Sequence, residues 1–143
     1  MSESGIILDL LANPSVTGYT TLDLTDQELP LLRGVSPDII TLQIGVNDFF
    51  QGVSLEEFTT RYTRLLEDIL RISPHSRLIL IDIPDYGKTP YGRQTGDPRV
   101  IHDGITLYNA RIRTIAEKYH LPVADVFTPS LLVEMDTSLT TSD

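Results

Sequence analysis

The stretch DIITLQIGVNDFF, residues 38–50, decides how this chain folds. It begins as an apolar run rich in β-branched residues, which is typical of a strand that is covered on both faces. The run ends at Gly45, and Asn47 and Asp48 follow almost directly. The sequence therefore predicts a buried strand that delivers a glycine, an amide and a carboxylate at its carboxyl end.

Further strands and helices alternate along the chain. RLILIDIP (77–84) and the shorter PVADVF (122–127) are two more apolar runs. Between the runs, apolar residues recur at helical spacing over residues 55–70 and 101–119. This order of elements predicts an α/β fold with a parallel sheet.

The expected helices carry start signals in the local sequence. Ser54 and Glu57 fit a capping box, and Asp97 precedes Pro98 as an N-cap precedes a first-turn proline. Upstream, TTLDLTDQELPLL indicates one or two short helical turns that are interrupted near Pro30.

Ligand sites in such folds lie in the loops at the carboxyl ends of the strands. Three segments qualify, residues 45–53, 84–98 and 128–143. The middle segment is rich in glycine, proline and tyrosine, which suits either the wall of a pocket or an ordinary surface loop. The sequence leaves both interpretations open.

Composition narrows the classes of partner and cofactor. The 143 residues suit a single domain, and a formal charge of -9, from 11 Lys and Arg against 20 Asp and Glu, argues against nucleic acid and anionic membranes as partners. The chain has no cysteine, which excludes disulfides and thiol chemistry. Its histidines and carboxylates show no metal-ligand spacing, so we expect no metal and no other cofactor.

Neither a signal segment nor an apolar run near the ~20 residues of a membrane span occurs in the sequence. We therefore expect a soluble, cytoplasmic protein, unless an N-terminal signal has been removed.

A second segment, NPSVTGYTT (13–21), changes how the strand end is interpreted. Gly18 can offer an unobstructed backbone N–H, and the Asn47 amide can donate two hydrogen bonds. Together these groups would form a two-donor oxyanion hole. The alternative is a simple turn that leaves the strand, in which Asp48 bonds its own backbone.

These two segments, with their spacing and the elements that follow, resemble the second and third conserved blocks of the SGNH hydrolases, also called GDSL esterases and lipases. The resemblance covers nearly the whole chain. It implies a three-layer α/β/α sandwich of flavodoxin type, with a parallel sheet. It also implies hydrolysis of small-molecule acyl esters by a Ser-His-Asp mechanism without a metal, with Gly18 and Asn47 as the oxyanion-hole residues.

The sequence departs from this family at both ends. The family's Gly-Asp-Ser block is absent, and the only serines before Asn13 are Ser2 and Ser4. Asp143 falls where the resemblance places the catalytic aspartate, and the histidine three residues later would lie beyond it. His102 is the candidate base within the chain, the alternative being an ordinary exposed helix residue. We therefore expect residues 1–143 to be a single domain truncated at both ends, with little or no esterase activity.

The missing block also removes a strand. In the order 2-1-3-4-5 the first strand lies inside the sheet, so its absence leaves a gap that something must fill. The run GIILDLL (5–11) could fill it, or a second chain could. The interpretation we favour is that residues 5–11 are helical and that a segment missing from this sequence supplies the strand.

Two alternatives to an ester hydrolase remain. The chain could be a non-catalytic binding module that keeps the pocket, or an unrelated flavodoxin-like regulatory domain. A receiver domain would need an acidic cluster after its first strand, which is missing, and no phosphate-binding glycine motif occurs.

Overall fold

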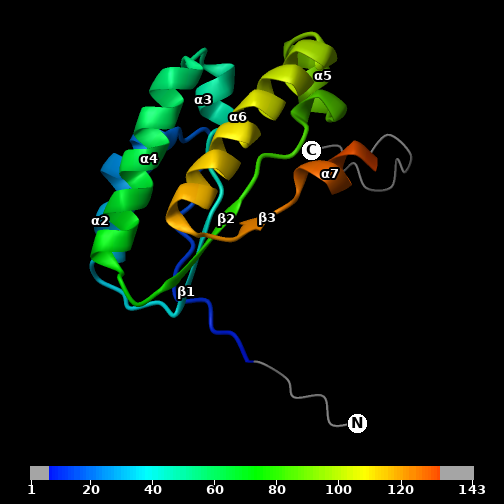
Figure 1. Ribbon diagram of the computed structural model, residues 1–143. Helices are drawn as coiled ribbons and strands as arrows, with labels where there is room; N and C mark the ends of the chain where they lie inside the picture. Colours follow the sequence, from blue (N-terminus) through cyan, green and yellow to red (C-terminus); the bar gives the residue numbers. More distant parts are fainter. Residues whose placement is uncertain (1–6, 133–143) are drawn as a thin grey trace.

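Three parallel strands form the centre of the computed structural model, which describes residues 7–132. β1 (Ile39–Leu42) pairs with β2 (Arg77–Ile81), and β2 pairs with β3 (Val123–Ala124), so that β2 lies in the middle. Leu42 is opposite Leu80, and Leu80 is opposite Val123. The predicted α/β fold with a parallel sheet is confirmed (Figure 1).

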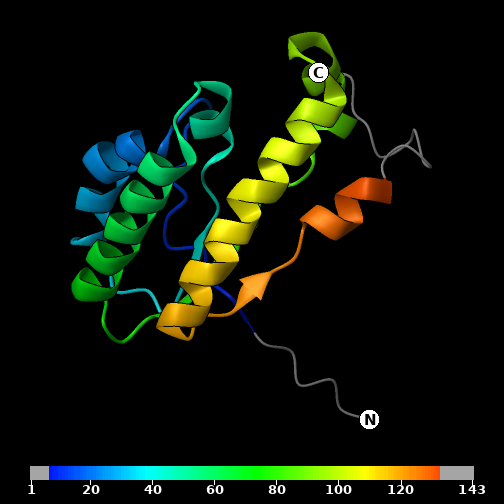
Figure 2. The ribbon, with the colours of Figure 1, turned by 45° about the horizontal axis from the view of Figure 1, so that its top comes forward.

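Two long helices cover one face of this sheet. α4 (Leu55–Ile72) connects β1 to β2, and α6 (Pro98–Tyr119) connects β2 to β3. Both connections step in the same direction across the sheet, and such crossovers are right-handed, so both helices lie on the same face. Figures 1 and 2 show α4 and α6 side by side there. Within residues 7–132 the second helical layer of the expected sandwich is not seen, so the fold is incomplete.

The predicted helix starts are confirmed. Ser54 Oγ accepts a hydrogen bond from the Glu57 N–H at 3.2 Å. Asp97 Oδ1 accepts one from the Arg99 N–H at 2.9 Å, and Pro98 is the first residue of α6.

The segment before β1 forms consecutive short helices that pack against α4. They are α1 (Thr21–Asp23), the π-helical turn η1 (Leu24–Glu28) and α2 (Leu29–Leu32). Thr20 caps α1, since its N–H donates to Asp23 Oδ2 at 2.8 Å and its hydroxyl accepts from the Asp23 N–H. Pro30 does not interrupt the chain of helices, because it lies in the first turn of α2, where its missing N–H is not needed.

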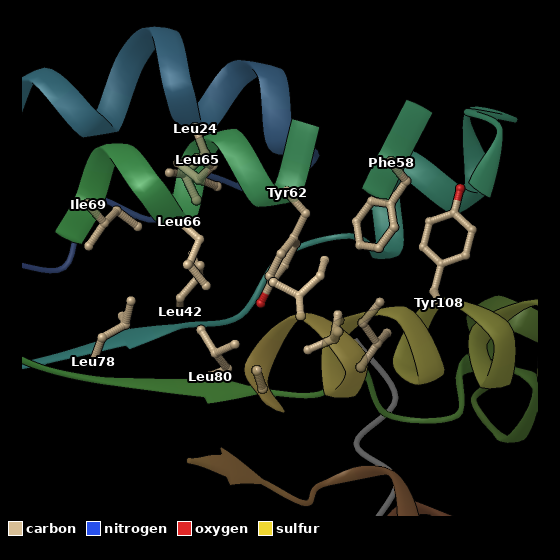
Figure 3. Packing of buried hydrophobic residues seen from close by; sticks show 14 of the residues in the cluster. Leu24, Leu42, Phe58, Tyr62, Leu65, Leu66, Ile69, Leu78, Leu80 and Tyr108 are labelled. Atoms are coloured by element: carbon tan, nitrogen blue, oxygen red, sulfur yellow. The ribbon is translucent and has the colours of Figure 1, made fainter. Parts of the chain in front are cut away.

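The core lies between the sheet and the two long helices (Figure 3). Fully burying one such apolar side chain stabilises the fold by about 1.5–3 kcal/mol. The buried apolar residues from the strands, α4 and α6 are Leu42, Leu78, Leu80, Phe58, Tyr62, Leu65, Leu66, Ile69, Ile101, Ile105, Tyr108, Ile112, Ile115 and Ala116.

The segment over residues 7–16 is neither helix nor strand. Its apolar side chains are exposed, with Ile7 at 89% and Leu10 at 83%. The favoured prediction of a helix over residues 5–11 is therefore wrong for residues 7–11, and residues 5 and 6 lie outside the described part. These residues do not form a central strand either, and β1 has β2 as its only strand partner among the described residues.

None of the helices within residues 7–132 combines the length and the apolar character needed to cross a bilayer.

Candidate functional site

The end of β1 turns sharply into the short helix α3 (Val46–Phe50) through Gly45. Gly45 has a φ of 125°, a conformation that favours glycine. A Cβ at this position would lie 2.8 Å from Cε2 of Phe58, so packing also requires a glycine. The turn places Asn47 and Asp48 in the first turn of α3, at the carboxyl edge of the sheet.

The Gly18 segment forms a turn of its own. The Tyr19 N–H donates to the Val16 carbonyl at 3.3 Å, and Gly18 has a φ of 92°. No atom lies within 4 Å of the position that a Cβ would take, so the backbone conformation and not the space calls for glycine. Gly18 is exposed, and among the described residues no group accepts a hydrogen bond from its N–H.

The structure brings Asn47 next to this turn. Its half-buried side chain donates from Nδ2 to the carbonyl oxygen of Tyr19 at 2.9 Å. One hydrogen of the Asn47 amide is used in this way, and the other is left for a ligand. Gly18 and Asn47 therefore lie close together, as expected, and their role in binding an oxyanion stays a prediction.

Asp48 fixes the distance between the two segments. Its carboxylate is fully buried and accepts hydrogen bonds from the Thr21 N–H at 2.9 Å and from the Thr21 hydroxyl at 2.6 Å. Burial raises the pKa of Asp48, while the bonds from Thr21 act in the opposite direction. The Asp48 backbone N–H also contributes to the environment of this carboxylate, as in the alternative of a simple turn, but the bonds from Thr21 are the larger interactions. Sequence reasoning considered Thr21 as a helix N-cap and missed its pairing with Asp48.

A second group of polar residues lies beyond β2. The buried carboxylate of Asp85 contacts Nδ1 of His102 at 2.7 Å and accepts a hydrogen bond from the Gly87 N–H at 3.0 Å. An Nδ1–H that donates to Asp85 leaves Nε2 of His102 as the basic nitrogen. His102 is thus paired rather than an ordinary exposed helix residue, and sequence reasoning missed Asp85 as its partner.

The His102 side chain lines a concavity of about 500 Å³, together with Arg99 and Leu131. No hydrogen bond or ion pair joins His102 to Asn47 or Gly18 in the described part of the chain.

The remaining sequence candidates are not placed by the structure. Asp143, Ser2 and Ser4 lie outside the described residues. Within residues 7–132 no group of histidines and carboxylates is arranged to hold a metal ion.

Known proteins resemble this chain in sequence and in fold. A multidomain esterase from Ruminococcus flavefaciens is 34% identical over 90 residues, which are 62% of this chain and 11% of that protein. The crystal structure of phospholipase A1 from Streptomyces albidoflavus NA297 superposes with a TM-score of 0.55 at 16% identity, over 82% of this chain and 59% of that one. The latter likeness shows the fold alone.

The chain spans less than two thirds of the length of both these proteins. The family match extends much further along the chain itself, over residues 7–141. On this match the chain belongs to the GDSL-like lipase/acylhydrolase family.

Proposed function

We propose that this chain carries the oxyanion-binding part of an acyl-ester hydrolase, with the Gly18 N–H and the Asn47 side-chain amide as the two donors. The observation that carries the proposal is the hydrogen bond from Asn47 Nδ2 to the Tyr19 carbonyl. This bond holds the amide beside the Gly18 turn and leaves one hydrogen of the amide free to donate. Membership in the family sets aside the unrelated regulatory domain that the sequence left open.

The donors would act on the tetrahedral intermediate of ester hydrolysis. When a nucleophile attacks the ester carbonyl, negative charge develops on its oxygen, and fixed N–H donors stabilise that charge. By the family resemblance, a serine is the nucleophile, a histidine shuttles its proton and Asp143 orients the histidine. Within residues 7–132 neither the serine block nor the histidine block of this mechanism is recognised, and His102 is the candidate base there.

Asp48 and Thr21 contribute through position. Their hydrogen bonds, at 2.9 and 2.6 Å, tie the Gly18 segment to the start of α3, so the two donors are held at a fixed separation before a substrate arrives. Donors fixed in advance need no reorganisation during the reaction.

The test is a titration of the isotope-labelled chain with butyrate, an acid product whose carboxylate oxygen imitates the oxyanion. We expect the NMR signals of the Gly18 backbone amide and the Asn47 side-chain amide to shift together. Asn47→Ala is expected to weaken the shift at Gly18. Asn13→Ala is the matched control, because Asn13 is exposed and its side chain bonds only Ser15 among residues 7–132. Shifts elsewhere with both amides unmoved would refute the proposal.

An esterase assay with short-chain p-nitrophenyl esters completes the test. The chain by itself is expected to turn over little or no ester, since the serine and histidine blocks are not found in it. In an active form, loss of one oxyanion donor typically lowers kcat by about 10²–10³. Robust turnover that falls in the Asn47→Ala variant would support the donors and contradict the expectation of an inactive chain.

A further inference from the structure

An aromatic cluster begins on α3, three residues after the candidate donor Asn47. Phe50 follows Asn47 by three residues on α3, and residues at this spacing are neighbours on a helix surface. The Phe50 ring meets Tyr86 edge-to-face at 6.0 Å between centroids and Tyr91 at 5.6 Å. We call Phe50, Tyr86 and Tyr91 the aromatic platform.

Both tyrosines of the platform come from residues 84–98, the segment for which the sequence left a pocket wall and a surface loop as open interpretations. This segment folds into the 3₁₀ turn η2 (Tyr86–Lys88) and the helix α5 (Pro90–Thr95). Asp85 caps the first, and Thr89 caps the second by accepting from the Gly92 N–H at 3.0 Å.

Gly92 lets the two elements approach closely. A Cβ at this position would lie 1.8 Å from the Tyr86 carbonyl oxygen, so only glycine fits without moving the backbone. The caps and this contact fix the backbone that carries both tyrosines, and the rings are thereby held against Phe50.

The platform remains accessible to a ligand. Tyr91 is 56% exposed, and Phe50 and Tyr86 are partly buried. Single exposed apolar residues are normal on protein surfaces and need no explanation. Phe50 in edge-to-face contact with both tyrosines, three residues along α3 from the Asn47 donor, forms a surface on which a flat apolar group can lie.

We propose that the aromatic platform binds a ring-bearing substituent of the ester substrate and so favours aromatic esters over linear alkyl esters. An aromatic ring gains edge-to-face and stacking contacts on such a surface in addition to the area that it buries, whereas a linear chain gains the area alone. The proposal rests on the proposed function only in taking the ligand to be an ester.

The experiment uses two ketones that imitate esters and cannot be hydrolysed, benzylacetone with a phenyl ring and methyl hexyl ketone with a linear chain. Their dissociation constants for the whole chain are measured by NMR titration, followed at the Phe50 and Tyr91 ring signals. We expect benzylacetone to bind about three- to tenfold more tightly. Tyr91→Ala is expected to abolish the preference, and Tyr91→Phe, which keeps the ring, to retain it.

Leu107→Ala is the matched control, because Leu107 on α6 is also 56% exposed and lies outside the platform. Equal binding of the two ketones, or a preference that survives Tyr91→Ala, would overturn the inference. The titration with butyrate keeps the two proposals separate. If butyrate does not shift the two donor amides, the preference for benzylacetone can still be observed. If the two ketones bind equally, the Asn47-dependent shift at Gly18 can still be observed.

Discussion

Asp48 is the residue whose environment makes the clearest prediction about pH. Burial raises its pKa above the ordinary value of 3.8 in the folded state. The folded protein therefore holds the proton more tightly than the unfolded chain does. The contribution of Asp48 to the free energy of unfolding is fully present below pH 3.8 and is lost as the pH rises through the raised pKa. The difference in the free energy of unfolding between the wild type and Asp48→Asn should therefore decrease as the pH rises through this interval. Urea unfolding at several pH values measures this difference.

Asp23→Asn provides a control with the opposite sign. The hydrogen bonds from Thr20 lower the pKa of Asp23, so its contribution to stability is present above its ordinary value of 3.8 and is lost as the pH falls through the lowered pKa. A wild-type minus Asp48→Asn difference that rises with pH, as expected for Asp23, would mean that the hydrogen bonds from Thr21 lower the pKa of Asp48 more than burial raises it.

Individual residues also show how far the sequence predicts the candidate site. Gly18 and Asn47 were predicted from their residue types, since a glycine N–H and an amide are the donors that an oxyanion needs. The hydrogen bonds that hold Gly18 and Asn47 in place were not predicted. Asp48 and Thr21, which form these bonds, are far apart in sequence, and no local pattern pairs them. The bonds of Asn109 were not predicted for the same reason. Its amide donates to the Ile83 carbonyl and accepts from the Ile83 N–H, both at 2.8 Å, and Ile83 is far from it in sequence.

At the scale of elements, α4 carries one polar atom into the core. Tyr62 is fully buried, and its hydroxyl has no hydrogen-bond partner among the described residues (Figure 3). An unpartnered buried hydroxyl destabilises the folded state, because it gives up its bonds to water without replacing them. Tyr62→Phe keeps the ring and should raise the free energy of unfolding by about 1 kcal/mol, as measured by chemical denaturation.

The same substitution at Tyr108 on α6 should have the opposite effect. The Tyr108 hydroxyl donates to the Val53 carbonyl, so Tyr108→Phe leaves that acceptor without its partner and should lower the free energy of unfolding. Equal destabilisation by both substitutions would mean that the Tyr62 hydroxyl is hydrogen-bonded after all.

Elements were predicted best where local chemistry sets their limits. The starts of α4 and α6 follow from Ser54 and Asp97, which bond the backbone within a few residues. The strand expected over residues 122–127 forms only at Val123–Ala124. It ends there because Asp82 Oδ1 accepts from the N–H groups of Val126 and Phe127 at 2.7 and 3.0 Å. Asp82 is the residue that follows β2, so this contact comes from a distant part of the sequence and cannot be read from the local pattern.

At the scale of the whole molecule, the sheet has an open edge at β1. The sequence predicted a gap inside the sheet; within residues 7–132 the structure shows an open edge instead, because β1 has a strand partner on one side only and no strand lies beyond it. Residues 7–11 form no strand beside it, and Ile39 at its start is 46% exposed. Which segment or second chain completes the sheet stays a prediction.

An open strand edge with unpaired N–H and C=O groups is a template for pairing with another chain. We therefore expect the chain to self-associate through β1 at high concentration. A charge on an edge strand opposes such pairing, so Thr41→Lys, at an exposed position of β1, should reduce the self-association seen in sedimentation velocity over a concentration series. Thr114→Lys, at an exposed position of α6, adds the same charge away from the edge and should leave self-association nearly unchanged. A chain that stays monomeric throughout, or an equal reduction by both lysines, would mean that the β1 edge does not recruit a second strand.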